Sequence, residues 1–318
     1  LCLIGLIGCV AFRLLVLGTV ARRGGEVAAV VGPATERARV IGLALGLALL
    51  VAGVLRLAAQ VYALGGFEGA LARNLLVGTA WGRGWILQIA ATVLALVGLR
   101  SAEGEGARVG WGAAAAAALV LAVTPALSGH AVAAQGTAGL AIVADALHVI
   151  GAGGWLGTLA MIVAAGIPAA LDLEPSLRGP AVAALVRVFS PAALVFAGVL
   201  AATGLYASAL HLGSVAALFE TAYGTALLFK LAAIAVVVGL GAYNLFRVKP
   251  ALGDDAGIAK LRRSSTAELV AASIVLIATA LLVATPPAVE APAAEEQASE
   301  IAAPVGATGE KSAPSTGS

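Results

Sequence analysis

Three histidines and one aspartate are the side chains of this chain that are best suited to bind a metal ion. Asp145 and His148 are three residues apart, so a helix would place both on one face. His130 precedes this pair, His211 follows it, and the sequence contains no other histidine. Imidazole and carboxylate groups together suit Cu(II) and other borderline divalent ions. These four residues are the predicted metal ligands.

Three further side chains could support such a site. Trp155 lies seven residues after His148, which is two helical turns deeper on the same face. Lys230 lies near the start of a later apolar segment, at a depth that matches Asp145, and Glu220 precedes that segment. Lys230 could simply neutralise Asp145 or extend to the membrane surface. Alternatively, Lys230 or His148 competes for Asp145, which would link metal entry to proton release.

Other polar residues in the apolar segments have ordinary interpretations beside the functional ones. Each histidine could be a packed or interfacial imidazole rather than a ligand. Cys2 and Cys9 are two helical turns apart, too far along a helix to form a disulfide, and they are either small packing residues or soft ligands for Cu(I). Gln88 could form a hydrogen bond between helices.

The composition predicts a membrane protein. Hydrophobic residues make up 61% of the 318 residues, charged residues 11%, and the mean hydropathy is +1.02. Soluble proteins carry roughly 25% charged residues. The net charge of +2 and the absence of basic runs interleaved with aromatic residues argue against a nucleic-acid partner. The expected partner along most of the chain is the lipid bilayer.

The apolar runs predict an all-α bundle of about eight transmembrane helices. A helix needs about 20 apolar residues to cross a hydrocarbon core of about 30 Å. These runs are long and do not alternate, so strands are not expected, and helices satisfy their own backbone groups in lipid. The predicted spans are 1–20, 39–59, 84–100, 110–127, 139–165, 185–210, 224–246 and 267–285.

The same pattern predicts three regions. Residues 1–127 hold the first four spans, and residues 128–285 hold a loop and the last four. Residues 286–318 are rich in Ala, Pro, Glu, Ser, Thr and Gly, have little apolar surface to bury, and are predicted to be a disordered acidic tail. The sequence starts without Met inside an apolar run, so we expect further residues upstream of Leu1.

The distribution of basic residues predicts the orientation. Lys and Arg gather in the cytoplasmic loops of membrane proteins. The connections after even-numbered spans, with the tail, hold three basic residues, which are Arg73, Arg83 and Lys311. The connections after odd-numbered spans hold thirteen, which are Arg22, Arg23, Arg37, Arg39, Arg100, Arg108, Arg178, Arg187, Arg247, Lys249, Lys260, Arg262 and Arg263. Both termini, His130 and His211 are therefore predicted to lie outside the cytoplasm.

Short motifs between residues 120 and 250 resemble those of a known family. In chain order they are Ser128-Gly129-His130-Ala131, Asp145-Ala146-Leu147-His148, Trp155-Leu156-Gly157, Phe189-Ser190, Thr203-Gly204-Leu205-Tyr206, His211-Leu212-Gly213-Ser214, Tyr223-Gly224, Leu228-Phe229-Lys230-Leu231 and Tyr243-Asn244. Together they resemble the copper resistance D (CopD) family of bacterial inner-membrane proteins. The first hundred residues resemble that family by hydropathy alone.

The resemblance implies eight helices and a role in moving or handling copper at the bacterial inner membrane. It also implies a periplasmic copper-binding partner of the CopC type, sometimes fused upstream. Family members commonly carry a histidine in the first span, whereas residues 1–20 contain none. This departure bears on whether a complete multi-histidine site is present.

These observations predict a multi-pass inner-membrane copper transporter, with both termini periplasmic, that imports periplasmic copper and serves copper homeostasis and resistance. An enzyme is not expected, because the sequence shows no nucleophile–base pair, HExxH motif or carboxylate dyad. One alternative is a b-type haem protein with His148 and His211 as iron ligands. Another is a membrane subunit that transports nothing and assists the assembly of a copper enzyme.

Overall fold

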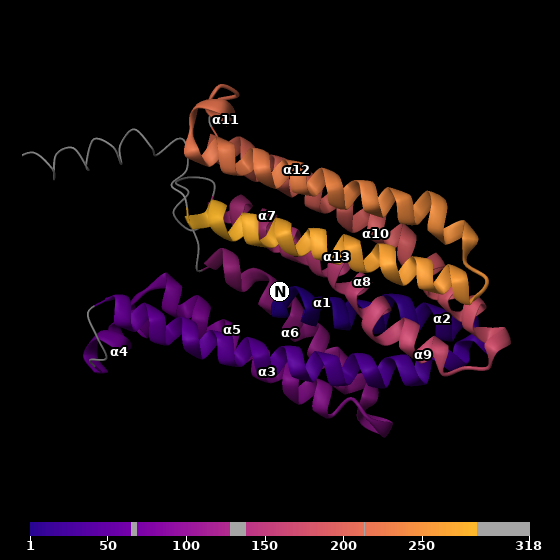
Figure 1. Ribbon diagram of the computed structural model, residues 1–318. Helices are drawn as coiled ribbons and strands as arrows, with labels where there is room; N and C mark the ends of the chain where they lie inside the picture. Colours follow the sequence, from indigo (N-terminus) through magenta and orange to yellow (C-terminus); the bar gives the residue numbers. More distant parts are fainter. Residues whose placement is uncertain (65–68, 128–137, 213, 285–318) are drawn as a thin grey trace, which may run out of the picture.

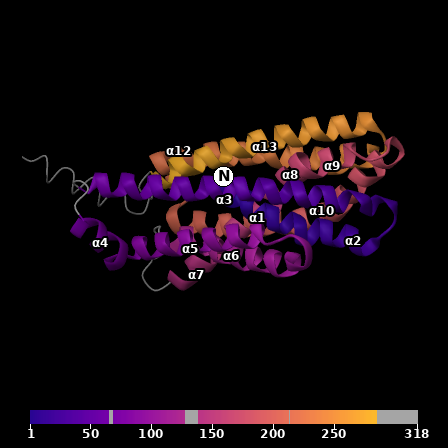
Figure 2. The same ribbon diagram turned by 90° about the horizontal axis from the view of Figure 1, so that it is seen from below.

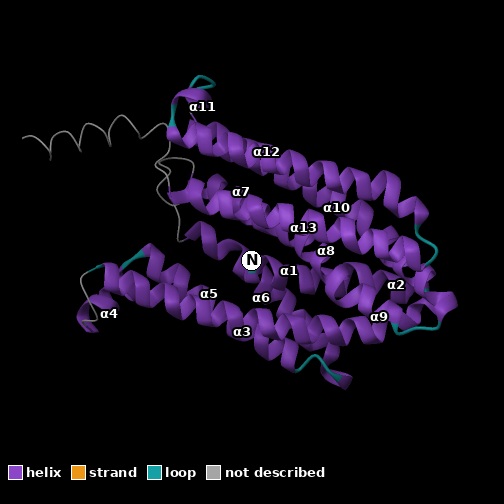
Figure 3. Cartoon of the chain, in the orientation of Figure 1, coloured by secondary structure: helices purple, strands orange, loops and turns teal. Residues whose placement is uncertain are grey.

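The computed structural model describes residues 1–64, 69–127, 138–212 and 214–284, and within these ranges it leaves out the side chains of residues 71, 72, 138, 211 and 280–284. All regular elements in the described ranges are helices (Figure 3). The long helices run side by side along one direction (Figures 1 and 2). Nearly every backbone group therefore finds its partner within its own helix, as an apolar environment requires.

Seven helical segments of the described chain are long and apolar enough to cross a membrane. The first segment consists of α1 (Cys2–Ala11), η1 (Phe12–Leu17) and α2 (Gly18–Arg23), and the second of η2 (Glu26–Val30) and α3 (Val31–Ala63). The third is α5 (Ala80–Arg100), and the fourth consists of η3 (Gly104–Gly106) and α6 (Ala107–Leu127). The fifth segment consists of α7 (Ala138–Ala152), η5 (Gly153–Gly157), α8 (Thr158–Met161), η6 (Ile162–Gly166) and α9 (Ile167–Leu171). The sixth is α10 (Pro175–Leu212), and the seventh consists of α12 (Ala222–Tyr243), η7 (Asn244–Val248) and η8 (Lys249–Ala251). A further long helix, α13 (Asp255–Ala284), packs beside α12.

The predicted all-α membrane bundle is confirmed. Each of the eight predicted spans coincides with one of these long helical segments, although the first begins one residue earlier, at Leu1, and the last ends at residue 285, outside the described residues. The helices extend beyond the predicted limits because hydropathy marks only the apolar part of a helix. For example, α3 begins at Val31, eight residues before the predicted span, and α13 begins at Asp255, twelve residues before its predicted span. The predicted tail, residues 286–318, lies outside the described residues.

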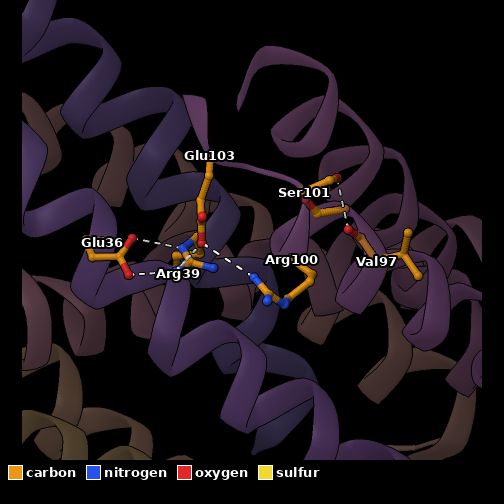
Figure 4. A network of polar contacts seen from close by, with 7 residues as sticks. Glu36, Arg39, Val97, Arg100, Ser101 and Glu103 are labelled. Atoms are coloured by element: carbon orange, nitrogen blue, oxygen red, sulfur yellow. Dashed lines mark hydrogen bonds and ion pairs between the residues drawn. The ribbon is translucent and has the colours of Figure 1, made fainter. Parts of the chain in front are cut away.

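A cluster of ion pairs ties the connections after odd-numbered spans together at one end of the bundle. The Arg39 guanidinium, which is buried, lies 2.7 Å from both Glu36 and Glu103. Arg100 lies 3.7 Å from Glu103 and completes the cluster (Figure 4). The first odd connection is thereby joined to the second.

Two more ion pairs join the remaining odd connections. Arg37 Nη2 lies 2.6 Å from Asp172 Oδ2, and Arg178 Nη1 lies 3.8 Å from Asp255 Oδ2. The short helices α4 (Gly69–Gly78) and α11 (Ala217–Glu220) lie at the opposite end (Figures 1 and 2). The basic residues that were counted for the orientation therefore gather at one end of the molecule.

One capping motif occurs twice, in corresponding connections of the two halves. Thr79 begins α5 and Thr221 begins α12, and each hydroxyl accepts a 3.0 Å hydrogen bond from the backbone N–H three residues later, at Gly82 and Gly224. A Cβ atom on either glycine would lie 2.2 Å from a carbonyl oxygen of the preceding short helix. Only glycine lets that short helix fold back onto the cap.

The order of elements around this motif also repeats. Each half has a first span that contains a π-helical segment (η1 or η5), a second helix of more than thirty residues (α3 or α10), a short helix (α4 or α11), a capped third span (α5 or α12) and a fourth long helix (α6 or α13). Nine residues after the capping threonine, a polar residue stands inside the third span of each half, Gln88 in the first and Lys230 in the second. The two halves thus have the same topology, with a different polar group at that shared position.

The centre of the bundle is a contact between two helix backbones. A Cβ atom on Gly8 of α1 would lie 2.1 Å from the carbonyl carbon of Gly157, and one on Gly157 would lie 2.3 Å from the carbonyl oxygen of Ile4. A Cβ atom on Gly153 would lie 2.4 Å from the side chain of Ile7. Without side chains between them, α1 and η5 approach closely enough for extensive van der Waals contact, which is the main attraction between helices in lipid.

We expect a Gly157→Ala substitution to destabilise the protein by about 1–3 kcal/mol, because the added methyl group would press on backbone rather than on a flexible side chain. Thermal unfolding of the detergent-solubilised protein measures this loss. Gly198→Ala is the matched control, since a Cβ atom there has no atom within 4 Å. Equal unfolding temperatures for the two variants would contradict the backbone contact.

We expect an Arg39→Met substitution to cost about 1–2 kcal/mol of unfolding free energy, because a buried guanidinium that bridges two carboxylates is lost. Arg37→Met removes one half-exposed pair and should cost less than about 1 kcal/mol, a loss that shrinks further at high salt. Chemical unfolding at low and high salt compares them. A smaller loss for Arg39→Met than for Arg37→Met would show that the cluster adds no stability.

Candidate metal-binding site

A histidine inside the fifth span forms a hydrogen bond across to the sixth. His148 is half-buried in α7, and its Nδ1 atom lies 2.9 Å from the hydroxyl oxygen of Thr203 in α10. A Cβ atom on Gly204 would lie 3.6 Å from His148 Cε1, so the small residue beside Thr203 leaves room for the ring. The packed, hydrogen-bonded imidazole that the sequence allowed is therefore present.

The partners of Thr203 determine which ring nitrogen of His148 carries the proton. The Thr203 hydroxyl donates its own proton to the carbonyl oxygen of Val199, 2.7 Å away. A hydroxyl has one proton, so toward His148 it acts as the acceptor, and Nδ1–H is the donor. In neutral His148 the lone pair then lies on Nε2. This arrangement matches metal-binding histidines, in which one ring nitrogen is held by a hydrogen bond and the other is the ligand.

Two charged residues accompany this imidazole. Asp145 lies one turn before His148 on α7 and is half-buried. Lys230 of α12 is also half-buried, and its positive charge acts electrostatically on His148. The structure therefore brings a carboxylate, an imidazole and an ammonium group from two helices into the same region of the bundle.

The other predicted site residues are placed only in part. His130 lies outside the described residues, and for His211 only the backbone, in the last turn of α10, is described. Glu220 is exposed at the end of α11. Within the described residues, no group of three or more His, Cys, Asp and Glu side chains could hold a metal ion. The convergence of the three histidines on one ion stays a prediction.

Trp155 belongs to a second polar cluster that the sequence reasoning missed. Its indole N–H lies within hydrogen-bonding reach of Glu268 in α13, and the Asn244 side chain donates a 2.7 Å hydrogen bond to the same carboxylate. Glu268 is buried, whereas the predicted span began one residue before it and so treated it as interfacial. The helix α13 begins at Asp255, so Glu268 lies well inside it and not at its end.

Arg56 and Gln88, two polar residues of the first half, bond to each other. Arg56 Nη1 donates a 3.4 Å hydrogen bond to Gln88 Oε1, so the predicted bond of Gln88 between helices is confirmed. The Arg56 guanidinium also lies over the Trp81 ring, 5.0 Å from its centroid. Cys9 is buried and its thiol donates to the carbonyl oxygen of Ala38, which favours the packing interpretation of this cysteine.

Comparison with known proteins finds two similarities, and the descriptions of both relatives name copper. The family model described as copper resistance protein D matches residues 183–282. The copper transport protein CutJ of Bacillus subtilis is 34% identical over 212 residues, which are 63% of this chain and 37% of that protein. The chain thus spans little more than a third of the length of this relative. The comparison with solved structures found no match.

We expect Thr203→Val to release the imidazole of His148 from its Nδ1–H form, because valine preserves the shape of threonine but accepts no hydrogen bond. Nitrogen chemical shifts of the labelled imidazoles report the tautomer, and with three histidines in the sequence the spectra are simple to assign. Thr203→Ser should retain the wild-type signal. An unchanged His148 spectrum in Thr203→Val would contradict the assigned bond.

Proposed function

We propose that the chain is a multi-pass membrane protein of the copper resistance protein D family that transports copper, with His148 as a ligand of the transported ion. The cargo is copper, and the direction is import from the periplasm across the bacterial inner membrane. Such a protein serves copper homeostasis and resistance and catalyses no reaction of its own.

The observation that carries this proposal is the 2.9 Å contact between His148 Nδ1 and the Thr203 hydroxyl inside the fifth span. His148 lies nine residues after Gly139, about 14 Å along the helix axis from the start of that span. An ionisable side chain so far inside a bilayer is energetically costly, and such residues usually have a function. The hydrogen bond to Thr203 engages one ring nitrogen of His148 and leaves the other available as a ligand. Asp145, one turn away, would supply the oxygen ligand that suits Cu(II).

The charge distribution supports the proposed orientation in the membrane. The connections rich in Lys and Arg meet at one end of the bundle, which we assign to the cytoplasm. The opposite end, where α7 begins and α10 ends, then faces the periplasm together with both termini. His130 and His211 would accept copper there, from a periplasmic CopC-type protein or from an upstream domain of the same kind.

Lys230 gives this site a means to control its occupancy. A positive charge near His148 opposes the binding of a copper ion unless Asp145 neutralises that charge. In the proposed cycle Asp145 leaves Lys230 to coordinate copper, so that entry of the metal ion would be linked to proton release. Glu220, exposed at the same end, would attract the cation toward the site.

We expect cells that produce this protein to accumulate more copper than cells that lack it, and we expect His148→Ala to remove that excess. Thr203→Val should weaken uptake less, by about tenfold to a hundredfold in apparent affinity, since it removes the group that orients the ligand and not the ligand itself. Elemental analysis of washed cells, at equal amounts of membrane-inserted protein, measures the copper.

Three outcomes would replace this function by another. Copper contents that are the same with and without the protein, and with His148→Ala, would remove the transport function. A Soret band in the purified protein would support the haem alternative, although His211 lies eight residues after Thr203, about 12 Å further along α10 than the partner of His148. Wild-type uptake in all histidine variants, with failed maturation of a copper enzyme, would indicate an assembly subunit.

A further inference from the structure

The described chain contains one buried acidic side chain, and it lies at the centre of a helix. Glu268 stands near the midpoint of α13 and is 2% exposed. It belongs to the cluster with Trp155 and Asn244, which is separate from the His148 region. Carboxylates at this depth in a membrane protein are rare and typically act in the passage of ions or protons.

The backbone around Glu268 is shaped to bring donors to it. Asn244 is the first residue of η7, and Trp155 is in η5, so both donors come from π-helical segments. Single π-helical turns change the direction of side chains in a helix and are frequent at functional sites. At Gly241, a Cβ atom would lie 3.5 Å from Glu268 Oε1 and 3.6 Å from Trp155 Cζ2, so a larger residue would crowd both groups.

A cavity of about 260 Å³ opens beside the carboxylate. Its walls come from α8, α10, α12 and α13 and are mostly aliphatic and aromatic. Two polar atoms in its lining have no hydrogen-bond partner among the described residues, Asn244 Oδ1 and the hydroxyl of Ser265, a residue that is 1% exposed. The cavity lining therefore contains two oxygen atoms that are free to accept a hydrogen bond.

The protein supplies no positive charge to this carboxylate within the described residues. Among the residues that line the cavity, Glu268 is the one that carries a charge. On the packed helices, Arg187 and Arg247 are exposed, and Lys260 and Arg263 line a different groove together with Tyr243. An isolated ionised carboxylate in apolar surroundings costs several kcal/mol, so a cation must neutralise it.

A proton meets this need better than a metal ion. Zn²⁺, Ca²⁺ and Mg²⁺ take four or more ligands, and this cavity offers one carboxylate and two neutral oxygen atoms. A proton needs only one carboxylate oxygen. The O–H group of the acid can then donate to Ser265 Oγ or to Asn244 Oδ1, the two oxygens that otherwise lack partners.

We propose that Glu268 is an intramembrane proton-binding site, at which the carboxylate takes up a proton from the cavity and later releases it. Asn244 and Trp155 stabilise the ionised form through their N–H groups, and Ser265 stabilises the acid form. Trp155 lies seven residues after His148 on the same helix, about 10 Å along its axis. Coupling of this proton to copper movement rests on the proposed function, whereas the proton site itself does not.

Infrared difference spectroscopy of the purified protein in liposomes, titrated with acid and base, tests the site without copper. We expect a carboxylic-acid C=O band that appears as the pH falls and is absent from Glu268→Gln. Glu105→Gln, which alters an exposed glutamate, should retain the band. Circular dichroism checks that both variants are folded, and Ser265→Ala should shift the frequency of the band by removing an acceptor.

Two results would overturn the proposal. One is the absence of any Glu268-dependent acid band between acid and alkaline pH in the folded protein. The other is a Glu268 carboxylate signal that responds to Na⁺, K⁺ or copper at fixed pH but not to pH itself, because this would identify a metal site. A titrating band in a protein that fails to accumulate copper would sustain the proton site and reject the transport function alone.

Discussion

A polar side chain inside an apolar bundle has no water to bind, so its partner must come from its own helix or from a neighbouring one. This constraint organises the interior of the described chain. Arg56 bonds to Gln88, His148 to Thr203, and Asn244 to Glu268, and each pair joins two different helices. The same bonds that satisfy these groups also fix which atoms stay available, such as the Nε2 lone pair of His148.

The two halves show how one topology can carry different chemistry. The polar residue nine positions after the capping threonine is Gln88 in the first half, where it accepts a hydrogen bond from Arg56. In the second half it is Lys230, which stands near a histidine. The first half thus pairs a buried arginine with an uncharged amide, whereas the second brings an imidazole, a carboxylate and an ammonium group into one region of the bundle. The family model matches residues of this second half.

Hydropathy predicted the fold because lipid requires long apolar helices, and that requirement is visible in any stretch of sequence. It also predicted the pairing of polar groups one turn apart, as for Asp145 and His148. Contacts between helices were not predictable in this way. Nothing in the local sequence couples Trp155 to Glu268, more than one hundred residues away, and the π-helical turns that aim Trp155 and Asn244 leave no hydropathy signal. The histidine convergence and the division of the chain into 1–127, 128–285 and a tail stay predictions.

The backbone contact between Gly8 and Gly157 restricts how such a bundle can rearrange. Helices that touch through their main chains cannot roll past one another, so the first and fifth spans behave as a single rigid strut. In the fifth span, 61% of the most apolar stretch is buried, whereas the corresponding share in the seventh span is 11%. The least buried of the candidate spans contains α12, which packs beside α13, and these two helices carry Lys230 and Glu268. A tilt of this hairpin would displace both charges at once, while His148 and Trp155 stayed fixed on the strut.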